Sequence, residues 1–257
     1  MATDTQPWVK KISAANDGKG VTIGIHLIYA LAVPCTKKNT NCLQYLSGDL
    51  VKDYIEPAAK RGWVVILDTQ LGRANPLDQI KHIRDQGYLK YDNVHVAIDP
   101  EFHASSGQVN PGIPIGTVAA SDINAVQEIL DNYVESEKLK TKKILIVHQF
   151  GDAAVHDGVP FMIQQKKTLK SYGNVELVID ADGLGSPAVK IWKYDLMTDA
   201  QTYPCVGFRG IKIFFPNRWE RNGHFDTPPM SVDEIFGATK APGARRMTSK
   251  PNVVIIA

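Results

Sequence analysis

The chain has 257 residues, of which 44% are hydrophobic and 22% are charged, and its formal net charge is +2. This length fits one large α/β domain, and the balance of apolar and charged residues is that of a globular protein. The small net charge and the lack of a long basic run argue against nucleic acid as the main partner. No stretch reaches the roughly 18 apolar residues that a membrane span needs.

Apolar stretches bounded by turn residues predict seven strands, in chain order Val21–Tyr29, Trp63–Gln70, Val94–Phe102, Lys143–Phe150, Val175–Asp182, Gly210–Phe215 and Asn252–Ile256. Helical patterns fall between them, at about Leu43–Arg61, Pro76–Gln86, Ser121–Glu137, Pro160–Ser171, Pro187–Asp199 and Ser231–Gly237. Strands that alternate with helices form right-handed crossovers and a parallel sheet. We therefore predict a single-domain parallel (β/α) TIM-like barrel over residues 1–257, distorted or seven-stranded, with a polar N-terminal extension over residues 1–20. An open doubly wound sheet is the alternative.

Several motifs with known chemistry are missing. No predicted strand is followed by G-x-G-x-x-G, and neither a Walker motif nor a G-x-S-x-G elbow occurs. We therefore expect no bound cofactor. The polar N-terminus lacks an apolar signal core, so the chain is either cytoplasmic or a secreted mature form from which a signal was removed. Cys35 and Cys42 flank a short polar loop, and they either bridge in an oxidising compartment or remain two separate thiols.

Acidic side chains gather where three of the predicted strands end. Asp99 and Glu101 end one strand, Asp180 and Asp182 end another, and Asp68 ends a third. Alternate residues of a strand share a face, and ligands of parallel α/β proteins bind at the C-terminal ends of the strands. These acids are therefore expected to line one pocket.

Other polar and aromatic residues fall near the same strand ends. Lys212 stands between two apolar strand residues and is expected to pair with an acid. An aromatic side chain such as Trp219, in a long loop, suits stacking on the face of a sugar. We predict that the following residues bind substrate: Asp182, Asp68, Gln70, His148, Gln149, Lys212, Trp219 and His26.

Paired carboxyl groups favour glycoside hydrolysis, which needs one protonated and one ionised carboxyl group. Crowded carboxylates push their pKa values apart, which assigns the two roles. We predict Glu101 as the general acid and Asp99 or Asp180 as the second carboxylate. The partner is then a small-molecule or polysaccharide substrate, and the oligomeric state stays open.

Three other functions fit the same residues. A metal-dependent hydrolase or lyase would use ligands of the right types but without compact spacing, so we assign no metal; these ligands are Asp99, Glu101, His103, His148, Asp180 and Asp182. A Schiff-base aldolase would use Lys212 as its nucleophile. A non-catalytic barrel would bind glycan through its acids without cleaving it. Acids at strand ends also serve as helix caps and loop anchors.

Seven stretches carry a resemblance to a known family: Trp63–Arg73, Ile98–His103, Pro111–Asn124, Lys143–Phe150, Asp182–Gly185, Gly210–Phe215 and Met230–Phe236. In these stretches the chain resembles a family of mainly actinobacterial proteins with DPEF or DPEW and VHQF motifs, many of them predicted to be secreted or lipoprotein-like. The resemblance implies a (β/α) barrel and a secreted location. The Asp99-x-Glu101 pair is also similar to the D-x-E strand end of barrel-fold muramidases, which favours glycan cleavage.

Overall fold

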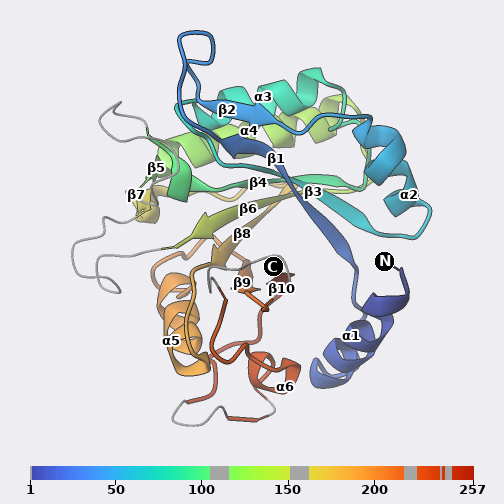
Figure 1. The fold of residues 1–257 in the computed structure, drawn as a ribbon, viewed down its shortest axis with the longest axis vertical. Coiled ribbons are helices and arrows are strands. Elements are labelled where there is room, and N and C mark those ends of the chain that lie inside the picture. Colours follow the sequence, from blue (N-terminus) through green and yellow to red (C-terminus); the bar gives the residue numbers. More distant parts are fainter. Residues whose placement is uncertain (1, 105–115, 151–161, 217–224, 238, 241–244) are drawn as a thin grey trace.

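A computed structural model gives the fold and describes residues 2–104, 116–150, 162–216, 225–237, 239–240 and 245–257. One large curled sheet dominates the molecule (Figure 1). Its strands are, in spatial order, β10 (Val253–Ile256), β9 (Phe208–Ile213), β8 (Val175–Ala181), β6 (Lys143–Gln149), β4 (Val94–Ile98), β3 (Val64–Thr69), β1 (Gly24–Ala32) and β2 (Leu43–Tyr45). A second, two-stranded sheet pairs β5 (Val118–Ala119) with β7 (Ile163–Gln164).

All seven predicted strands form, and they lie side by side in the order in which the chain makes them. The prediction Val94–Phe102 is too long, because the strand ends at Ile98 and Pro100–Phe102 form a 3₁₀ turn that Asp99 caps. Neighbours among these seven are parallel, and only β2 is antiparallel. The closed TIM-like barrel is not confirmed, because no ladder joins β10 to β1 in the described part of the chain. Instead, β2 pairs with Ala30–Ala32 at the end of β1, so an added strand occupies the edge that closure would use. The sheet is therefore a half-barrel.

The helices are α1 (Ala2–Ala15), α2 (Glu56–Ala59, after a π-helical turn at Val51–Ile55), α3 (Pro76–Asp85), α4 (Ala120–Ser136), α5 (Pro187–Met197) and α6 (Val232–Ile235), with 3₁₀ turns at Pro100–Phe102 and Lys166–Thr168. Figure 1 shows α3 and α4 together along one side of the curled sheet, with α5, α6 and α1 on the opposite side. None of the helices within the described ranges is both long and apolar enough to cross a bilayer.

The helix starts follow local capping rules. Asn75 caps α3 by accepting a hydrogen bond from the Leu77 amide, and Pro76 occupies the first turn, where its missing N–H costs nothing. Ser231 and Glu234 form a capping box at α6. These short-range signals explain why the predicted helix starts agree with the structure there.

Two predicted helices are wrong in part. The segment Leu43–Arg61 begins as strand β2 and becomes helical only from residue 51, because Leu43–Tyr45 pairs with the end of β1. Within the described part of Pro160–Ser171, β7 and a 3₁₀ turn replace the helix, and Gln165 between them adopts a left-handed conformation. A further difference lies at the N-terminus, where the predicted polar extension contains α1.

Helix α1 packs against the last part of the fold. The ring of Trp8 meets that of Phe215 edge to face, with centroids 5.5 Å apart. Ile12 and Ala15 pack against the same apolar cluster as α6. An amphipathic stripe of three residues therefore attaches the predicted extension to the domain.

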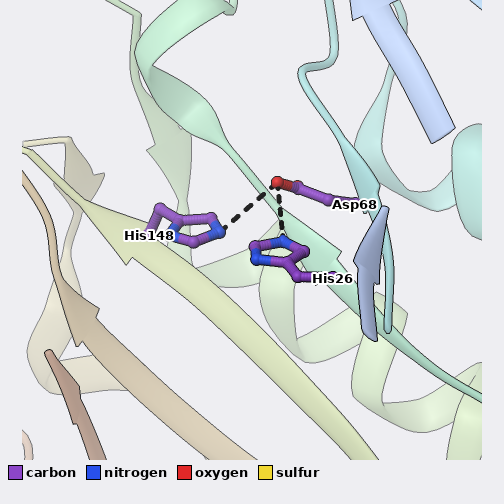
Figure 2. A group of neighbouring side chains, drawn as sticks. All are labelled: His26, Asp68 and His148. Carbon is purple, nitrogen blue, oxygen red and sulfur yellow. Dashed lines mark hydrogen bonds and ion pairs between the residues drawn. The ribbon is translucent and has the colours of Figure 1, made fainter. Parts of the chain in front are cut away.

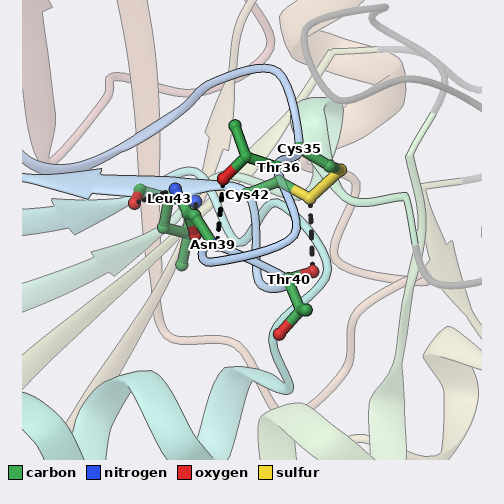
Figure 3. The surroundings of a disulfide bond; sticks show 6 residues. All are labelled: Cys35, Thr36, Asn39, Thr40, Cys42 and Leu43. Atoms are coloured by element: carbon green, nitrogen blue, oxygen red, sulfur yellow. Dashed lines mark hydrogen bonds between the residues drawn. A yellow bond between two sulfur atoms is a disulfide. The ribbon is translucent and has the colours of Figure 1, made fainter.

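Cys35 and Cys42 form a disulfide in the loop between β1 and β2 (Figure 3). The alternative of two separate thiols is therefore not what the structure shows. The backbone of Cys42 accepts a hydrogen bond from Val33, and the neighbouring Asn41 carbonyl accepts one from Arg73. The bridged loop is thus joined to the segment that follows β3, at the carboxyl edge of the sheet.

Candidate active site

The concave face of the sheet carries a polar layer directly beyond an apolar one. Ile66, Ala97, Ile146, Val178 and Ile255 form a buried cluster inside the curl. Strand residues two positions apart share a face, so the residues two positions beyond this apolar cluster point to the same side of the sheet. They are the polar residues Asp68, Asp99, His148, Asp180 and, in register with Ile255, Lys212.

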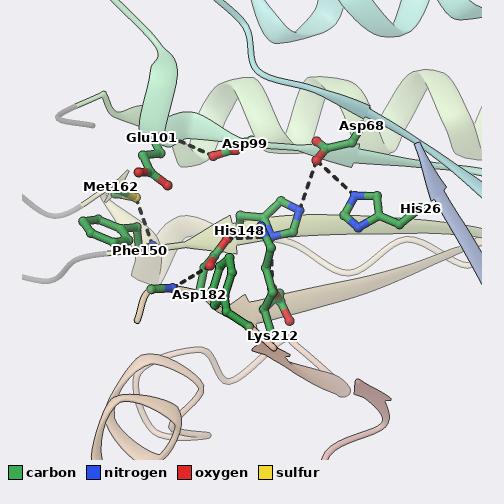
Figure 4. Close-up of polar contacts among 12 residues, drawn as sticks. His26, Asp68, Asp99, Glu101, His148, Phe150, Met162, Asp182 and Lys212 are labelled. Carbon is green, nitrogen blue, oxygen red and sulfur yellow. Dashed lines mark hydrogen bonds and ion pairs between the residues drawn. The ribbon is translucent and has the colours of Figure 1, made fainter. Parts of the chain in front are cut away.

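His148 stands at the centre of the polar layer and contacts carboxylates on both sides (Figures 2 and 4). Its Nδ1 donates to Asp180 Oδ2 at 3.0 Å and lies 3.5 Å from Asp182 Oδ2. Its Nε2 lies 3.5 Å from Asp68 Oδ2, which accepts a hydrogen bond from His26 Nε2 at 3.0 Å. The two imidazole rings stack, with centroids 5.4 Å apart and planes 6° from parallel.

Two small residues make these contacts possible. Ala97 on β4 is in register with Asp68 and lies between that residue and β6, so His148 can reach Asp68 across it. Gly210 on β9 is in register with Asp180, and a methyl group there would collide with the Asp180 carboxylate. The polar layer therefore depends on the small residues Ala97 and Gly210 as well as on the charged ones.

Lys212 and Asp182 form the second charged pair. Lys212 Nζ lies 2.8 Å from Asp182 Oδ2, and Asp182 Oδ1 accepts a hydrogen bond from the Gly183 amide at 2.5 Å. Burial alone would raise the pKa of Asp182, but the charges of Lys212 and His148 hold it below its usual range. Burial alone would lower the pKa of Lys212, and the Asp182 carboxylate instead raises it. Both groups are therefore charged at neutral pH.

Asp68 and His148 are held in the same way. Burial opposes the charge of Asp68, but the positive charge of His148 and the hydrogen bond from His26 lower its pKa below its usual range. Burial also opposes the charge of His148, while Asp68 and the hydrogen bond to Asp180 raise its pKa well above the usual value. An imidazolium between carboxylates is the resulting arrangement.

Glu101 and Asp99 behave differently from the other acids. Asp99 caps the 3₁₀ turn after β4, where its Oδ1 accepts a hydrogen bond from the Glu101 amide at 3.1 Å. Figure 4 places Glu101 beside Phe150 and Met162, whose contact is a hydrogen bond from the Phe150 amide to the Met162 sulfur. The Glu101 carboxyl group is half-buried and has apolar neighbours on one side.

This environment keeps both carboxyl groups protonated to an unusually high pH. Burial raises the pKa of Glu101 to about 8, and the neighbouring Asp99 and Asp182 charges add to the effect. Burial likewise raises the pKa of Asp99 to about 7, against the attraction of His148. The site therefore combines a weakly acidic pair with carboxylates that remain ionised, which is the pattern of acid–base assignment in enzymes.

Not every predicted site residue joins this group. Gln70 is used by the fold, because its Oε1 accepts a hydrogen bond from the Ala32 amide at the end of β1. Gln149 is buried on the face opposite to His148. His103 contacts the Thr117 carbonyl. Trp219 lies outside the described residues, and its sugar-stacking role stays a prediction.

Three charged residues near the site escaped the sequence analysis: Lys190, Lys193 and Asp226. All three are buried, and Lys190 Nζ lies 3.5 Å from Asp226 Oδ2. A weak signal existed, since two lysines one helical turn apart flank the apolar pair at 191–192 just after the third acidic strand end. Solvated lysines are so common on helices that this signal alone does not indicate burial.

One part of the site has the donor set of a metal centre. Donor atoms of His26, Asp68 and His148 all lie within 4.8 Å of one another, as do those of His148, Asp180 and Asp182. Among the described residues, Asp68 Oδ1 and His148 Nε2 are buried without hydrogen-bond partners. Imidazole nitrogens and a carboxylate suit zinc and other first-row divalent ions. A metal would have to displace the proton that the facing carboxylates stabilise on His148.

No family model, curated protein or solved structure matches the chain.

The raised pKa of Glu101 has a measurable effect on stability. A carboxyl group whose pKa rises from 4.5 to about 8 on folding binds its proton more tightly in the folded chain. Its contribution to the free energy of unfolding is thus complete below the lower value and is lost as the pH rises through the upper one. We expect wild type to lose stability relative to Glu101→Gln between these two pH values in chemical denaturation series. Parallel stability curves would contradict the raised pKa.

Proposed function

We propose that the protein is a glycoside hydrolase in which Glu101 is the general acid and Asp99 is the second carboxylate. The observation that carries this proposal is the adjacent pair itself. Burial raises the pKa of Glu101 to about 8 and that of Asp99 to about 7, so the pair holds a proton that a general acid can donate near neutral pH. Glycosidic cleavage needs one protonated and one ionised carboxyl group beside the scissile bond.

In this proposal the Glu101 proton goes to the oxygen of the leaving sugar as the glycosidic bond breaks. The ionised Asp99 stabilises the positive charge that develops on the sugar ring, or activates the attacking water. Asp180, the other candidate for the second carboxylate, is fully buried and hydrogen bonded to His148. We therefore assign it to orienting His148.

The buried charges below the pair fix its electrostatics. His148 and Lys212 draw the pKa of Glu101 downward, while Asp99 and Asp182 push it upward. Because these groups are held by ion pairs on rigid strands, the balance is set before substrate binds. The Schiff-base alternative is less well supported, because the ion pair with Asp182 keeps Lys212 protonated and an ammonium is not a nucleophile.

We also propose a secreted location, in keeping with the family resemblance. The Cys35–Cys42 disulfide supports it, because disulfides persist mainly in oxidising compartments.

The test is to incubate the protein with a panel of oligosaccharides and polysaccharides and to measure hydrolysis as the release of reducing ends. Cleavage by wild type that disappears in Glu101→Gln would support the proposal. Binding of a glycan by both proteins without cleavage by wild type would instead favour a non-catalytic glycan-binding protein.

The second candidate is a metal-dependent hydrolase or lyase, which the convergence of His26, Asp68 and His148 favours. In that case the metal would activate water, and Glu101 would act as the acid. Both candidate functions use Glu101 as the acid, and they differ in whether a metal is required.

We expect hydrolysis to survive a chelator. Two carboxyl groups cleave a glycosidic bond without a metal, and the proton on His148 competes with any ion at its position. The measurement is the initial rate before and after dialysis against EDTA. Loss of activity that added Zn²⁺, Mn²⁺ or Mg²⁺ restores would establish the metal-dependent function.

A further inference from the structure

A second group of cations lies behind the carboxyl end of β8, on helix α5. Lys190 and Lys193 are one helical turn apart, and both are buried. Lys190 is well supplied with partners: its ammonium donates to the Gly183 carbonyl at 2.7 Å and to the Lys212 carbonyl, and lies 3.5 Å from the Asp226 carboxylate. Asp226 in turn accepts hydrogen bonds from the backbone amides of Gly185 and Phe214. This lysine is an internal anchor.

Lys193 has no such set of partners. Its side chain is buried, with the residue 4% exposed, and its ammonium donates one hydrogen bond, to the Leu184 carbonyl at 2.9 Å. The ammonium also lies 5.7 Å from the centre of the Phe150 ring. Within the described ranges of the chain, no carboxylate lies at ion-pair distance from Lys193. Among the residues that the structure describes, it is thus a buried cation without an ion-pair partner, although the more distant charges of Asp182, Asp226 and Glu101 act on it.

Such a group is costly to keep in a folded protein. Burying a charge is unfavourable unless it is paired and hydrogen bonded, and an ammonium has three donors to satisfy. Burial, together with the neighbouring charge of Lys190, lowers the pKa of Lys193. An anion beside the ammonium would supply the missing charge and accept the remaining hydrogen bonds.

The ammonium of Lys193 lies at the edge of the proposed active site. A side chain at Gly183 would approach Lys193 Nζ to 3.0 Å and the Phe150 ring to 2.9 Å, so the missing side chain brings these groups close together. Gly183 directly follows Asp182, and Phe150 stands beside Glu101 (Figure 4). The charge of Glu101 acts on the pKa of Lys193, so a substrate group bound at Glu101 lies within electrostatic range of that ammonium.

We propose that Lys193 binds an anionic substituent of the substrate, which makes the substrate class an acidic glycan. The substituent is a carboxylate, a sulfate or a phosphate ester, since all three supply a negative charge and several acceptor oxygens. That the substrate is a glycan rests on the proposed glycoside hydrolase function, whereas the anion subsite rests on Lys193 alone.

The experiment measures binding of sugars to the full chain by thermal shift and by NMR titration at fixed ionic strength. The probes are glucuronate, glucose sulfate, glucose phosphate and, as the neutral control, glucose. We expect at least one anionic sugar to bind saturably and glucose not to bind. Lys193→Gln should weaken that binding by about tenfold or more, as for the loss of a hydrogen bond to a charged group. Lys60→Gln, at an exposed lysine that ends helix α2, should not change it.

Lys193→Gln removes a buried charge that has no ion-pair partner among the described residues, so we expect it to fold and to melt no lower than wild type. If it does not fold, Lys193→Arg replaces it and should retain anion binding. The subsite is overturned if no anionic sugar binds wild type, or if Lys193→Gln binds as well as wild type does. It is also overturned if wild type cleaves neutral glycans as fast as acidic ones. Anion binding that depends on Lys193, without hydrolysis of any glycan, would sustain the subsite and refute the glycosidase.

Discussion

Glu101→Gln is expected to lower kcat/KM for glycan hydrolysis by about 10²–10⁴-fold, which is the usual contribution of a general acid. The amide keeps the shape of the side chain and removes only the transferable proton. The backbone hydrogen bond from position 101 to Asp99 does not involve the substituted atoms, so the 3₁₀ turn after β4 should persist. The measurement is the rate of reducing-end release under subsaturating substrate.

A matched control separates this effect from a general loss of charge. Glu135→Gln makes the same change on the exposed face of α4 and should leave both rate and stability unchanged. Thermal unfolding of Glu101→Gln should be as cooperative as that of wild type. A variant that keeps its fold and its rate would remove Glu101 from the acid role, and a variant that does not fold would favour a structural role.

The parallel strands and their polar face could be predicted because both depend on local patterns. Apolar runs identify buried strands, and the period of two places Asp68, Asp99, His148 and Asp180 on one face. The pairing of Leu43–Tyr45 with β1 could not be predicted, because a three-residue strand carries little local signal and its partner is distant in sequence. The same pairing decides that the half-barrel has an edge at β2.

The chemistry of the site was less predictable than its location. Sequence spacing identifies Glu101 and Asp99 as neighbours, but burial raises the pKa values of both, whereas the ion pair with Lys212 and the charge of His148 lower that of the equally buried Asp182. The burial of Lys193 was missed because its partners are a backbone carbonyl and an aromatic ring from other parts of the chain. Such partners leave no trace in the spacing of charged residues.

Lys212→Met is expected to lower the free energy of unfolding by about 3–5 kcal/mol, the usual cost of removing one partner of a buried ion pair. Methionine fills a similar volume, but it leaves the Asp182 carboxylate buried without its cation. Lys142→Met is the matched control, because Lys142 and Glu176 are also 2.8 Å apart but exposed. Exposed pairs contribute about 0–1 kcal/mol, so chemical denaturation should distinguish the two variants clearly.

The double variant Lys212→Met/Asp182→Asn tests the cause of that loss. Neutralising Asp182 removes the stranded charge, so the double variant should regain part of the stability that Lys212→Met loses. Equal stability of the single and double variants would show that Lys212 stabilises the fold in some other way.

Treatment with borohydride and a carbonyl substrate tests whether Lys212 is a nucleophile. The ion pair with Asp182 keeps Lys212 protonated, so we expect no covalent label. Labelling at Lys212 together with inactivation would establish a Schiff-base enzyme.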